Sequence, residues 1–123
     1  MLEPAETVRI FQKQPTIKTI SSGQTIFTTG ETGNYMYGVL SGEVDILVNN
    51  KVIETIYEGD VFGIGALVVL DHTRASTAVA KTDCQLACLD RNNFLFAVQE
   101  TPMFALQVMR SYSERLRTLK SAN

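Results

Sequence analysis

The chain has 123 residues, of which 45% are hydrophobic and 20% are charged. This composition is typical of a globular protein and argues against disorder, and the length favours a single domain over residues 1–123. The formal net charge of −2 gives no overall attraction to nucleic acid or to an anionic membrane. The longest nearly apolar stretch, residues 61–70, is too short to span a bilayer. Because no basic and apolar leader opens the chain, we expect a cytoplasmic protein.

A short helix is expected over residues 4–12, and the segment that follows reads as short strands separated by turns. All eight glycines fall between Gly23 and Gly65, where they mark these turns. Asn49-Asn50 is expected to form a two-residue hairpin turn, because asparagine tolerates positive φ. Many short strands with turns about every 8–12 residues indicate an all-β barrel or sandwich. The strands are expected at residues 25–27, 35–40, 43–48, 51–57, 75–80 and 85–89.

Two helices are predicted after the strands, over about residues 91–120. Asp90 can cap the first, residues 91–100, and Thr101-Pro102 offers a cap and a first-turn proline for the second. In the second helix, apolar residues recur at alternating spacings of four and three, which is the heptad pattern of a helix packed along a partner helix. The pattern predicts a homodimer, and packing of the helix against its own strands is the alternative. The heptad residues are Ala105, Met109, Tyr112, Leu116 and Leu119.

Sequence signatures of catalysis and of metal binding are absent. There is no Gly-x-Ser-x-Gly elbow and no P-loop, and around His72, the single histidine, no His/Asp/Glu spacing indicates a metal. Cys84 and Cys88 would lie about 13 Å apart along one strand. That separation exceeds the roughly 7 Å between Cα atoms that a disulfide allows, so both cysteines are expected to be reduced. We therefore expect no enzyme, no catalytic residue, no metal and no cofactor.

One segment has the features of an anion site. Residues 61–67 read Val-Phe-Gly-Ile-Gly-Ala-Leu, and Arg74-Ala75-Ser76 follows after six further residues. The two glycines let backbone N–H groups approach a ligand without a Cβ in the way, and the apolar pair after them can begin a helix whose positive end holds an anion. Arg74 can clamp a phosphate by paired N–H donors. The alternative is a glycine-rich corner that an arginine caps. The predicted ligand-binding residues are Gly63, Ile64, Gly65, Ala66, Leu67, Arg74, Ala75 and Ser76.

Several motifs follow one another along the chain: Gly30-Glu31 after Phe27, Leu40-Ser41-Gly42-Glu43-Val44, Glu58-Gly59-Asp60-Val61-Phe62-Gly63, Arg74-Ala75-Ser76 and Asp90-Arg91-Asn92-Asn93-Phe94. With these motifs the sequence resembles the cyclic nucleotide-binding domain, the effector domain of regulators of the catabolite activator protein type. The resemblance runs from about residue 26 to residue 119. It implies a mainly β fold: an eight-stranded β-roll (a double-stranded β-helix, jelly-roll-like) over about residues 16–90, with an N-terminal helix and two C-terminal helices. It also implies that Arg74 binds the cyclic phosphate.

The sequence departs from the family pattern in two places. The family's phosphate-binding cassette normally reads Phe-Gly-Glu, and its glutamate accepts the ribose 2′-hydroxyl, whereas here Ile64 stands in that place and Gly65 follows. The regulators also continue into a helix-turn-helix domain, whereas this chain stops at Asn123. We therefore expect a stand-alone module that has no DNA-binding domain and does not bind DNA directly.

Together these features predict a non-catalytic signal-sensing module that binds a nucleotide second messenger. Cyclic di-GMP is favoured over cAMP, because a doubly phosphorylated guanine ligand would use further arginines and stacking tyrosines. The signal would pass through the C-terminal helices to a partner such as a transcription regulator. The alternatives are a cAMP or cGMP binder with a substituted ribose contact, and a ligand-free protein-interaction module with a degenerate pocket. The secondary ligand candidates are Arg9, Tyr35, Tyr37, Arg115 and Arg117.

Overall fold

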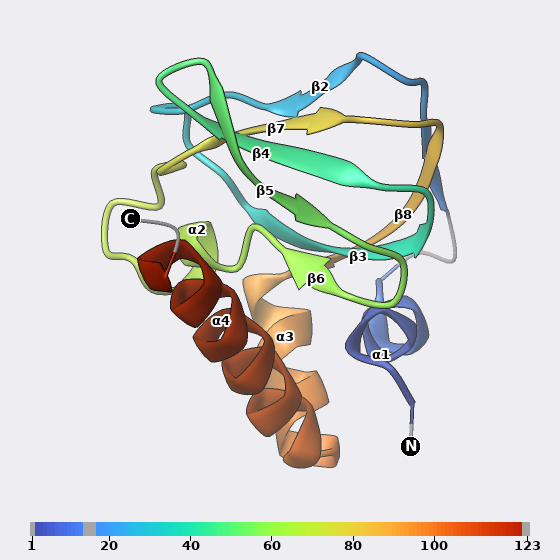
Figure 1. Cartoon of the computed structure of the whole chain (residues 1–123). Helices are drawn as coiled ribbons and strands as arrows, with labels where there is room; N and C mark the ends of the chain where they lie inside the picture. The colour runs from blue at the N-terminus through green and yellow to red at the C-terminus, as the bar shows by residue number, and fades with distance from the viewer. Residues whose placement is uncertain (1, 14–16, 122–123) are drawn as a thin grey trace.

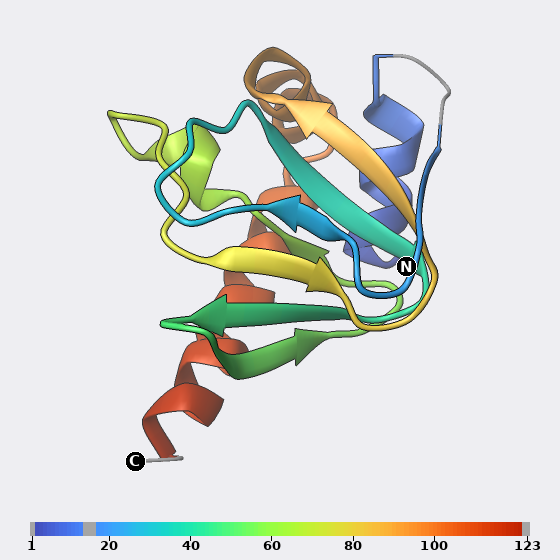
Figure 2. The ribbon, with the colours of Figure 1, turned by 90° about the horizontal axis from the view of Figure 1, so that it is seen from above.

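The computed structural model describes residues 2–13 and 17–121, and its strands form a β-roll of two four-stranded antiparallel sheets (Figure 1). The strands are β1 (Lys18–Ile20), β2 (Thr25–Phe27), β3 (Tyr35–Ser41), β4 (Val44–Val48), β5 (Lys51–Ile56), β6 (Val61–Phe62), β7 (Thr77–Ala80) and β8 (Cys84–Asp90). One sheet has the order β1-β8-β3-β6 and the other the order β2-β7-β4-β5. Figure 2 shows the second sheet from above, with its strands side by side in that order. The β-roll inferred from the family resemblance is confirmed.

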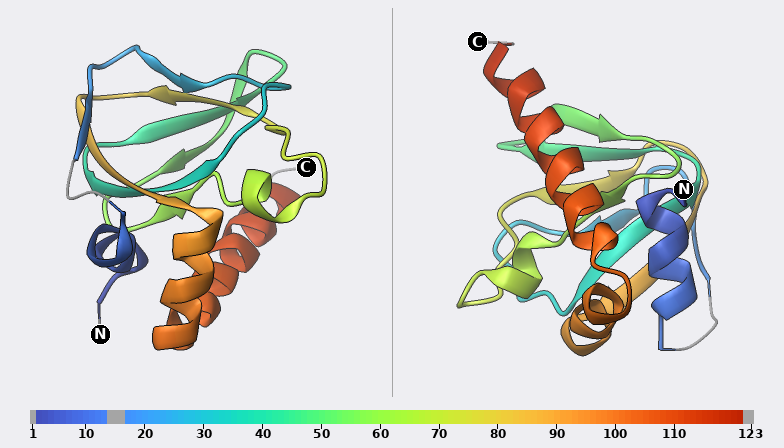
Figure 3. Two further views of the ribbon diagram at one scale, coloured as in Figure 1. Left: turned by 180° about the vertical axis from the view of Figure 1, so that it is seen from behind. Right: turned by 90° about the horizontal axis from the view of Figure 1, so that it is seen from below.

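The helices α1 (Pro4–Phe11), α3 (Arg91–Glu100) and α4 (Met103–Ser121) gather below the sheet that contains β3 and β8 (Figure 1). A fourth helix, α2 (Gly65–Val68), is a single turn between β6 and β7. The two views of Figure 3 show α4 running from the end of α3 across the roll toward β5. This course brings the C-terminal helix to the part of the roll where the predicted cassette lies.

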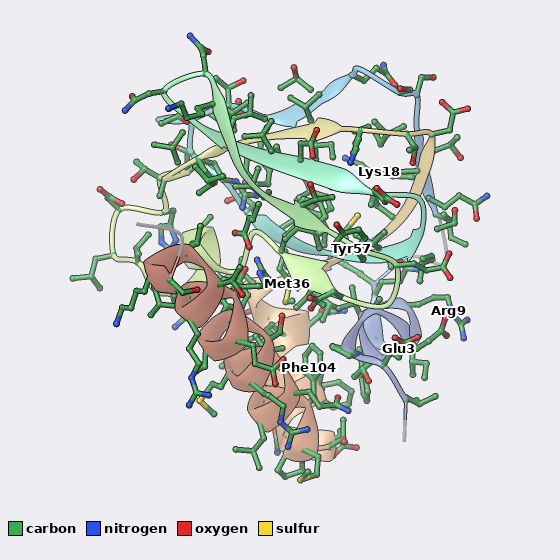
Figure 4. The ribbon with its side chains drawn as sticks, viewed as in Figure 1. Glu3, Arg9, Lys18, Met36, Tyr57 and Phe104 are labelled. Carbon is green, nitrogen blue, oxygen red and sulfur yellow. The ribbon has the colours of Figure 1, made fainter. Side chains whose placement is uncertain are left out.

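Two hydrophobic clusters form the core, one inside the roll and one between the roll and the helices. Successive side chains of a strand point to opposite faces, so β3 sends Tyr37 into the first cluster and Met36 into the second. Met36 and Phe104 of α4 are both almost fully buried in the second cluster and are labelled in Figure 4. Gly38 lets α1 approach β3 closely, since a Cβ at that position would lie 2.8 Å from the Cα of Ala5.

Most of the predicted elements are confirmed with small shifts at their ends. The turn at Asn49-Asn50 joins β4 to β5 with φ values of 53° and 62°, as the hairpin prediction requires. Asp90 caps α3, because its Oδ1 accepts a hydrogen bond of 2.8 Å from the N–H of Asn93. The sequence does not predict β1 or β6, which have three and two residues and are too short to show an alternating pattern. The expected start of the roll, at about residue 16, lies outside the described residues.

The two cysteines lie on one strand, as the sequence predicts. Cys84 and Cys88 both lie on β8 and both are free thiols. None of the helices in the described part of the chain is long and apolar enough to cross a bilayer.

The heptad residues of α4 do not share one environment. Met109 and Leu116 are 56% and 50% exposed, whereas Tyr112 turns toward the roll and packs against the second core cluster. Packing against the chain's own roll, the alternative explanation of the heptad pattern, therefore accounts for Tyr112. The homodimer stays a prediction.

Candidate functional site

The predicted cassette lies where the chain leaves β6 and returns to β7. β6 ends at Phe62, and the backbone turns at Gly63, whose φ of 79° lies in the left-handed region that favours glycine. The single turn of α2 begins at Gly65. The chain then passes through Arg74 and enters β7 at Thr77. Gly63 is thus needed for the sharp change from strand to helix, which brings the two halves of the cassette together.

The guanidinium of Arg74 lies inside the roll. The residue is only 5% exposed, and its Nη1 and Nη2 donate hydrogen bonds of 2.7 Å to the carbonyl oxygens of Gly63 and Tyr35. Its Cζ lies 4.0 Å from the centroid of the Phe27 ring, a cation–π contact. The remaining donor, Nε, has no hydrogen-bond partner, and it is the one such buried side-chain atom among the described residues.

Burial of Arg74 removes water from its charged guanidinium, which disfavours the charged form. Burial lowers the pKa of its guanidinium, while Tyr37 and Glu31 favour the charged form, which arginine keeps in proteins. Among the described residues, no carboxylate forms an ion pair with it. A buried cation without a carboxylate partner can gain a charge-assisted hydrogen bond from an anion such as a phosphate.

Gly33 provides the space that Arg74 occupies. A Cβ at this buried position would overlap the Nε of Arg74 and lie 2.7 Å from its Nη2. The sequence marks Gly33 only as part of a turn cluster, because its contact with Arg74 joins positions that are far apart in the chain.

A cavity of about 160 Å³ lies beside Arg74. Cassette residues form part of its wall, aromatic and aliphatic side chains of the roll form another part, and polar side chains of β5 and α4 complete it. The lining residues are Gly63, Gly65, Ala66, Arg74, Ala75 and Ser76 from the cassette, Phe27, Ile46 and Phe62 from the roll, and Glu54, Tyr112 and Arg115.

Polar contacts hold α4 over this cavity. The hydroxyl of Tyr112 accepts a hydrogen bond of 3.2 Å from the N–H of Ile64, a backbone donor of the cassette. Arg115 forms an ion pair of 3.0 Å with Glu54 and donates to the carbonyl oxygen of Val61 at 2.7 Å. The guanidinium of Arg115 also lies over the Tyr112 ring, 4.2 Å from its centroid. Burial raises the pKa of Tyr112, so its hydroxyl stays protonated at neutral pH. The C-terminal helix therefore bonds directly to the segment that would bind a phosphate.

The structure brings most of the predicted ligand-binding residues together around the cavity. The exceptions are Ile64 and Leu67, whose side chains pack in or against the second core cluster. Ile64 thus faces the site with its N–H rather than with its side chain.

The secondary candidates are more dispersed. Arg115 lines the cavity. The backbone carbonyl of Tyr35 accepts a hydrogen bond from Arg74, and Tyr37 is buried and stacked on the Phe62 ring. Arg9, labelled in Figure 4, lies on α1 and pairs with Glu6 at 2.8 Å. Arg117 is exposed on α4. Neither Arg9 nor Arg117 lines this cavity.

Sequence reasoning missed Glu54. The sequence marks it only as a polar residue among the strand formers of β5, and nothing there indicates that its side chain lies 3.0 Å from Arg115.

Comparison with known proteins identifies the family of this chain. The family model described as the cyclic nucleotide-binding domain matches residues 17–101, well over half of the chain. The chain belongs to the cyclic nucleotide-binding domain family. The resemblance inferred from the sequence motifs is thereby confirmed. Domains of this family are regulatory sensing modules.

One curated relative of this cyclic nucleotide-binding domain agrees with that assignment. A cAMP-dependent protein kinase regulatory subunit from Eremothecium gossypii is 43% identical over 77 residues, which are 63% of this chain and 17% of that protein. The chain thus spans less than a fifth of that relative's length.

Two solved structures have the same fold. The catabolite activator protein of Thermus thermophilus matches with a TM-score of 0.76 and 23% identity, covering 98% of this chain and 57% of the other. The c-di-GMP-responsive global regulator CLP of Xanthomonas campestris matches with a TM-score of 0.82 and 19% identity, covering 96% and 60%. At these identities the likeness shows the fold alone.

Proposed function

We propose that this domain is a non-catalytic sensor of a cyclic nucleotide second messenger, whose phosphate binds at Arg74. The observation that carries the proposal is the buried guanidinium of Arg74, which no carboxylate of the described residues pairs, in the wall of a cavity that the cassette lines. Family membership supports it independently, as does the relative that is a cAMP-dependent kinase subunit. The hydroxyl of Ser76, which also lines the cavity, is a further donor for the phosphate.

The size of the cavity bears on the identity of the ligand. Small-molecule sites usually have about 300–1,000 Å³, so the cavity of about 160 Å³ must widen before a nucleotide enters. Because Tyr112 and Arg115 form its wall on the side of α4, a displacement of this helix would widen the cavity. A cyclic mononucleotide needs less movement than a dinucleotide, so we favour it over the cyclic di-GMP that the sequence led us to expect. Cyclic di-GMP is the second candidate, supported by the presence of Arg115 in the wall.

Movement of α4 would also carry the signal out of the domain. Leu106, Met109 and Leu116 form an apolar face of α4 and are each about half exposed. We propose that ligand entry shifts this face and changes its contacts with a partner, either a second copy of the chain in a homodimer or a separate transcription regulator.

Nucleotide titration by calorimetry tests the proposal, with cAMP, cGMP and cyclic di-GMP as ligands. We expect one ligand to bind the unmodified protein and Arg74→Ala to weaken its affinity at least tenfold, since a hydrogen bond to a charged group contributes about 1.5–3 kcal/mol. Arg117→Ala, which removes an exposed arginine away from the cavity, is the matched control and should bind as the unmodified protein does.

Two results would refute the proposal. One is a folded Arg74→Ala variant that keeps full affinity. The other is the absence of binding by all three nucleotides, which would favour the ligand-free interaction module.

A further inference from the structure

The cavity contains a carboxylate that the phosphate does not need. Glu54 of β5 is the one acidic residue among the lining residues, and only 18% of its side chain is exposed. Its Oε1 pairs with Nε of Arg115 at 3.0 Å, and the Arg115 side chain is 17% exposed. Nη1 of Arg115 donates to Val61 and Ser111, so among the described residues Oε2 of Glu54 and Nη2 of Arg115 are the acceptor and donor that the pair leaves in the wall formed by β5 and α4.

We propose that Glu54 reads the base of the bound nucleotide and selects guanine, an inference that rests on the proposed function. Guanine has an acceptor, O6, beside two adjacent donors, N1–H and the N2 amino group. A carboxylate has two oxygens and accepts both donors in parallel, and arginine donates to O6. The adjacent groups of Glu54 and Arg115 match this order of donors and acceptor. Adenine has one amino donor next to an acceptor, so it leaves one carboxylate oxygen unpaired.

Electrostatics places Glu54 at the base rather than at the phosphate. A carboxylate next to the anionic phosphate would repel it, whereas Arg74 and the backbone donors of the cassette suit that charge. The base is neutral, and Arg115 already neutralises Glu54, so contact with the base adds no like-charge repulsion. The ring of Tyr112, which also lines the cavity, is an apolar surface on which a base can stack.

The ribose 2′-hydroxyl is the other donor that Glu54 could accept from, because Ile64 has replaced the cassette glutamate of the family. A hydroxyl donates a single hydrogen bond, however, so it engages one carboxylate oxygen, whereas the guanine edge donates two and engages both. The base edge uses both members of the pair, so we assign Glu54 to the base.

The test compares the affinities of cGMP, cIMP and cAMP for the unmodified protein by calorimetry. cIMP differs from cGMP only by lacking the N2 amino group. We expect cGMP to bind at least tenfold more tightly than cIMP and cAMP. In Glu54→Gln, which has the same shape but one acceptor oxygen, the preference for cGMP over cIMP should fall below threefold. Glu43→Gln is the matched control, since Glu43 pairs with Lys81 at 3.6 Å and does not line the cavity, and it should keep the preference of the unmodified protein.

Three outcomes would overturn the assignment while the proposed function stands. One is equal affinity of the unmodified protein for cGMP and cIMP, which needs no variant and is independent of how well Glu54→Gln folds. The second is an unchanged preference in a folded Glu54→Gln protein. The third concerns 2′-deoxy-cGMP, which lacks the ribose 2′-hydroxyl. If the unmodified protein binds it more weakly than cGMP, and Glu54→Gln binds the two equally, Glu54 contacts the ribose. Absence of binding by every nucleotide would instead refute the proposed function, and this inference with it.

Discussion

Replacing Gly33 by alanine tests whether Arg74 is held inside the roll as described. A Cβ at Gly33 would overlap Nε of Arg74, so the guanidinium would have to leave its position. The backbone of Gly33 itself does not lie in the left-handed region, so alanine is compatible with its conformation. Any destabilisation therefore comes from the displaced arginine rather than from backbone strain.

The size of the effect follows from the bonds that Arg74 loses. Its two hydrogen bonds of 2.7 Å to carbonyl oxygens are charge-assisted, and each contributes about 1.5–3 kcal/mol. Hydration of the released guanidinium recovers part of this stabilisation. We expect the free energy of unfolding to fall by about 2–4 kcal/mol, which lowers the Tm by roughly 10 °C for a domain of this size.

A double-mutant cycle measured by urea denaturation isolates the contact between the two residues. In an Arg74→Ala background the atoms that meet the new Cβ are gone, so Gly33→Ala should be neutral there. It could even stabilise that background by up to about 1 kcal/mol, because alanine restricts the unfolded chain. The expected coupling is therefore larger than about 1 kcal/mol. Additive effects of the two substitutions, within about 0.5 kcal/mol, would refute the described position of Arg74.

Two further predictions concern stability. Asp90→Ala should lower the free energy of unfolding by about 0.5–2 kcal/mol, because it removes the cap on the Asn93 N–H, and an unchanged urea midpoint would contradict that role. Burial raises the pKa values of Cys84 and Cys88. The stability that the protonated thiols contribute is therefore fully present below the ordinary thiol pKa and is lost as the pH rises through the raised values. Over that range each thiol lowers the free energy of unfolding by up to about 1.4 kcal/mol per pH unit. Urea melts between about pH 8 and pH 10 should show this decline, and a thiol-free Cys84→Ala/Cys88→Ala protein with the same slope would argue against it.

Several features of this protein could be predicted from the sequence because short-range rules decide them. The helix over residues 91–100 lies between a capping residue, Asp90, and the break before Pro102, and α3 has those bounds. The hairpin at Asn49-Asn50 depends on the backbone preference of asparagine alone. The order of the family motifs between Phe27 and Phe94 was sufficient to indicate the family, since each motif is a contiguous run of residues.

Only the tertiary structure decided how the site is arranged. The ion pair between Glu54 and Arg115 joins residues 61 positions apart, and Arg74 bonds to Tyr35 across 39 positions. No local pattern marks such pairs, because packing of the roll and of α4 brings them together. For the same reason the heptad spacing of α4 could not indicate that Tyr112 turns inward to the cassette while Met109 stays exposed. The sequence determined which segments fold and to which family they belong, whereas long-range packing determined which side chains meet in the cavity.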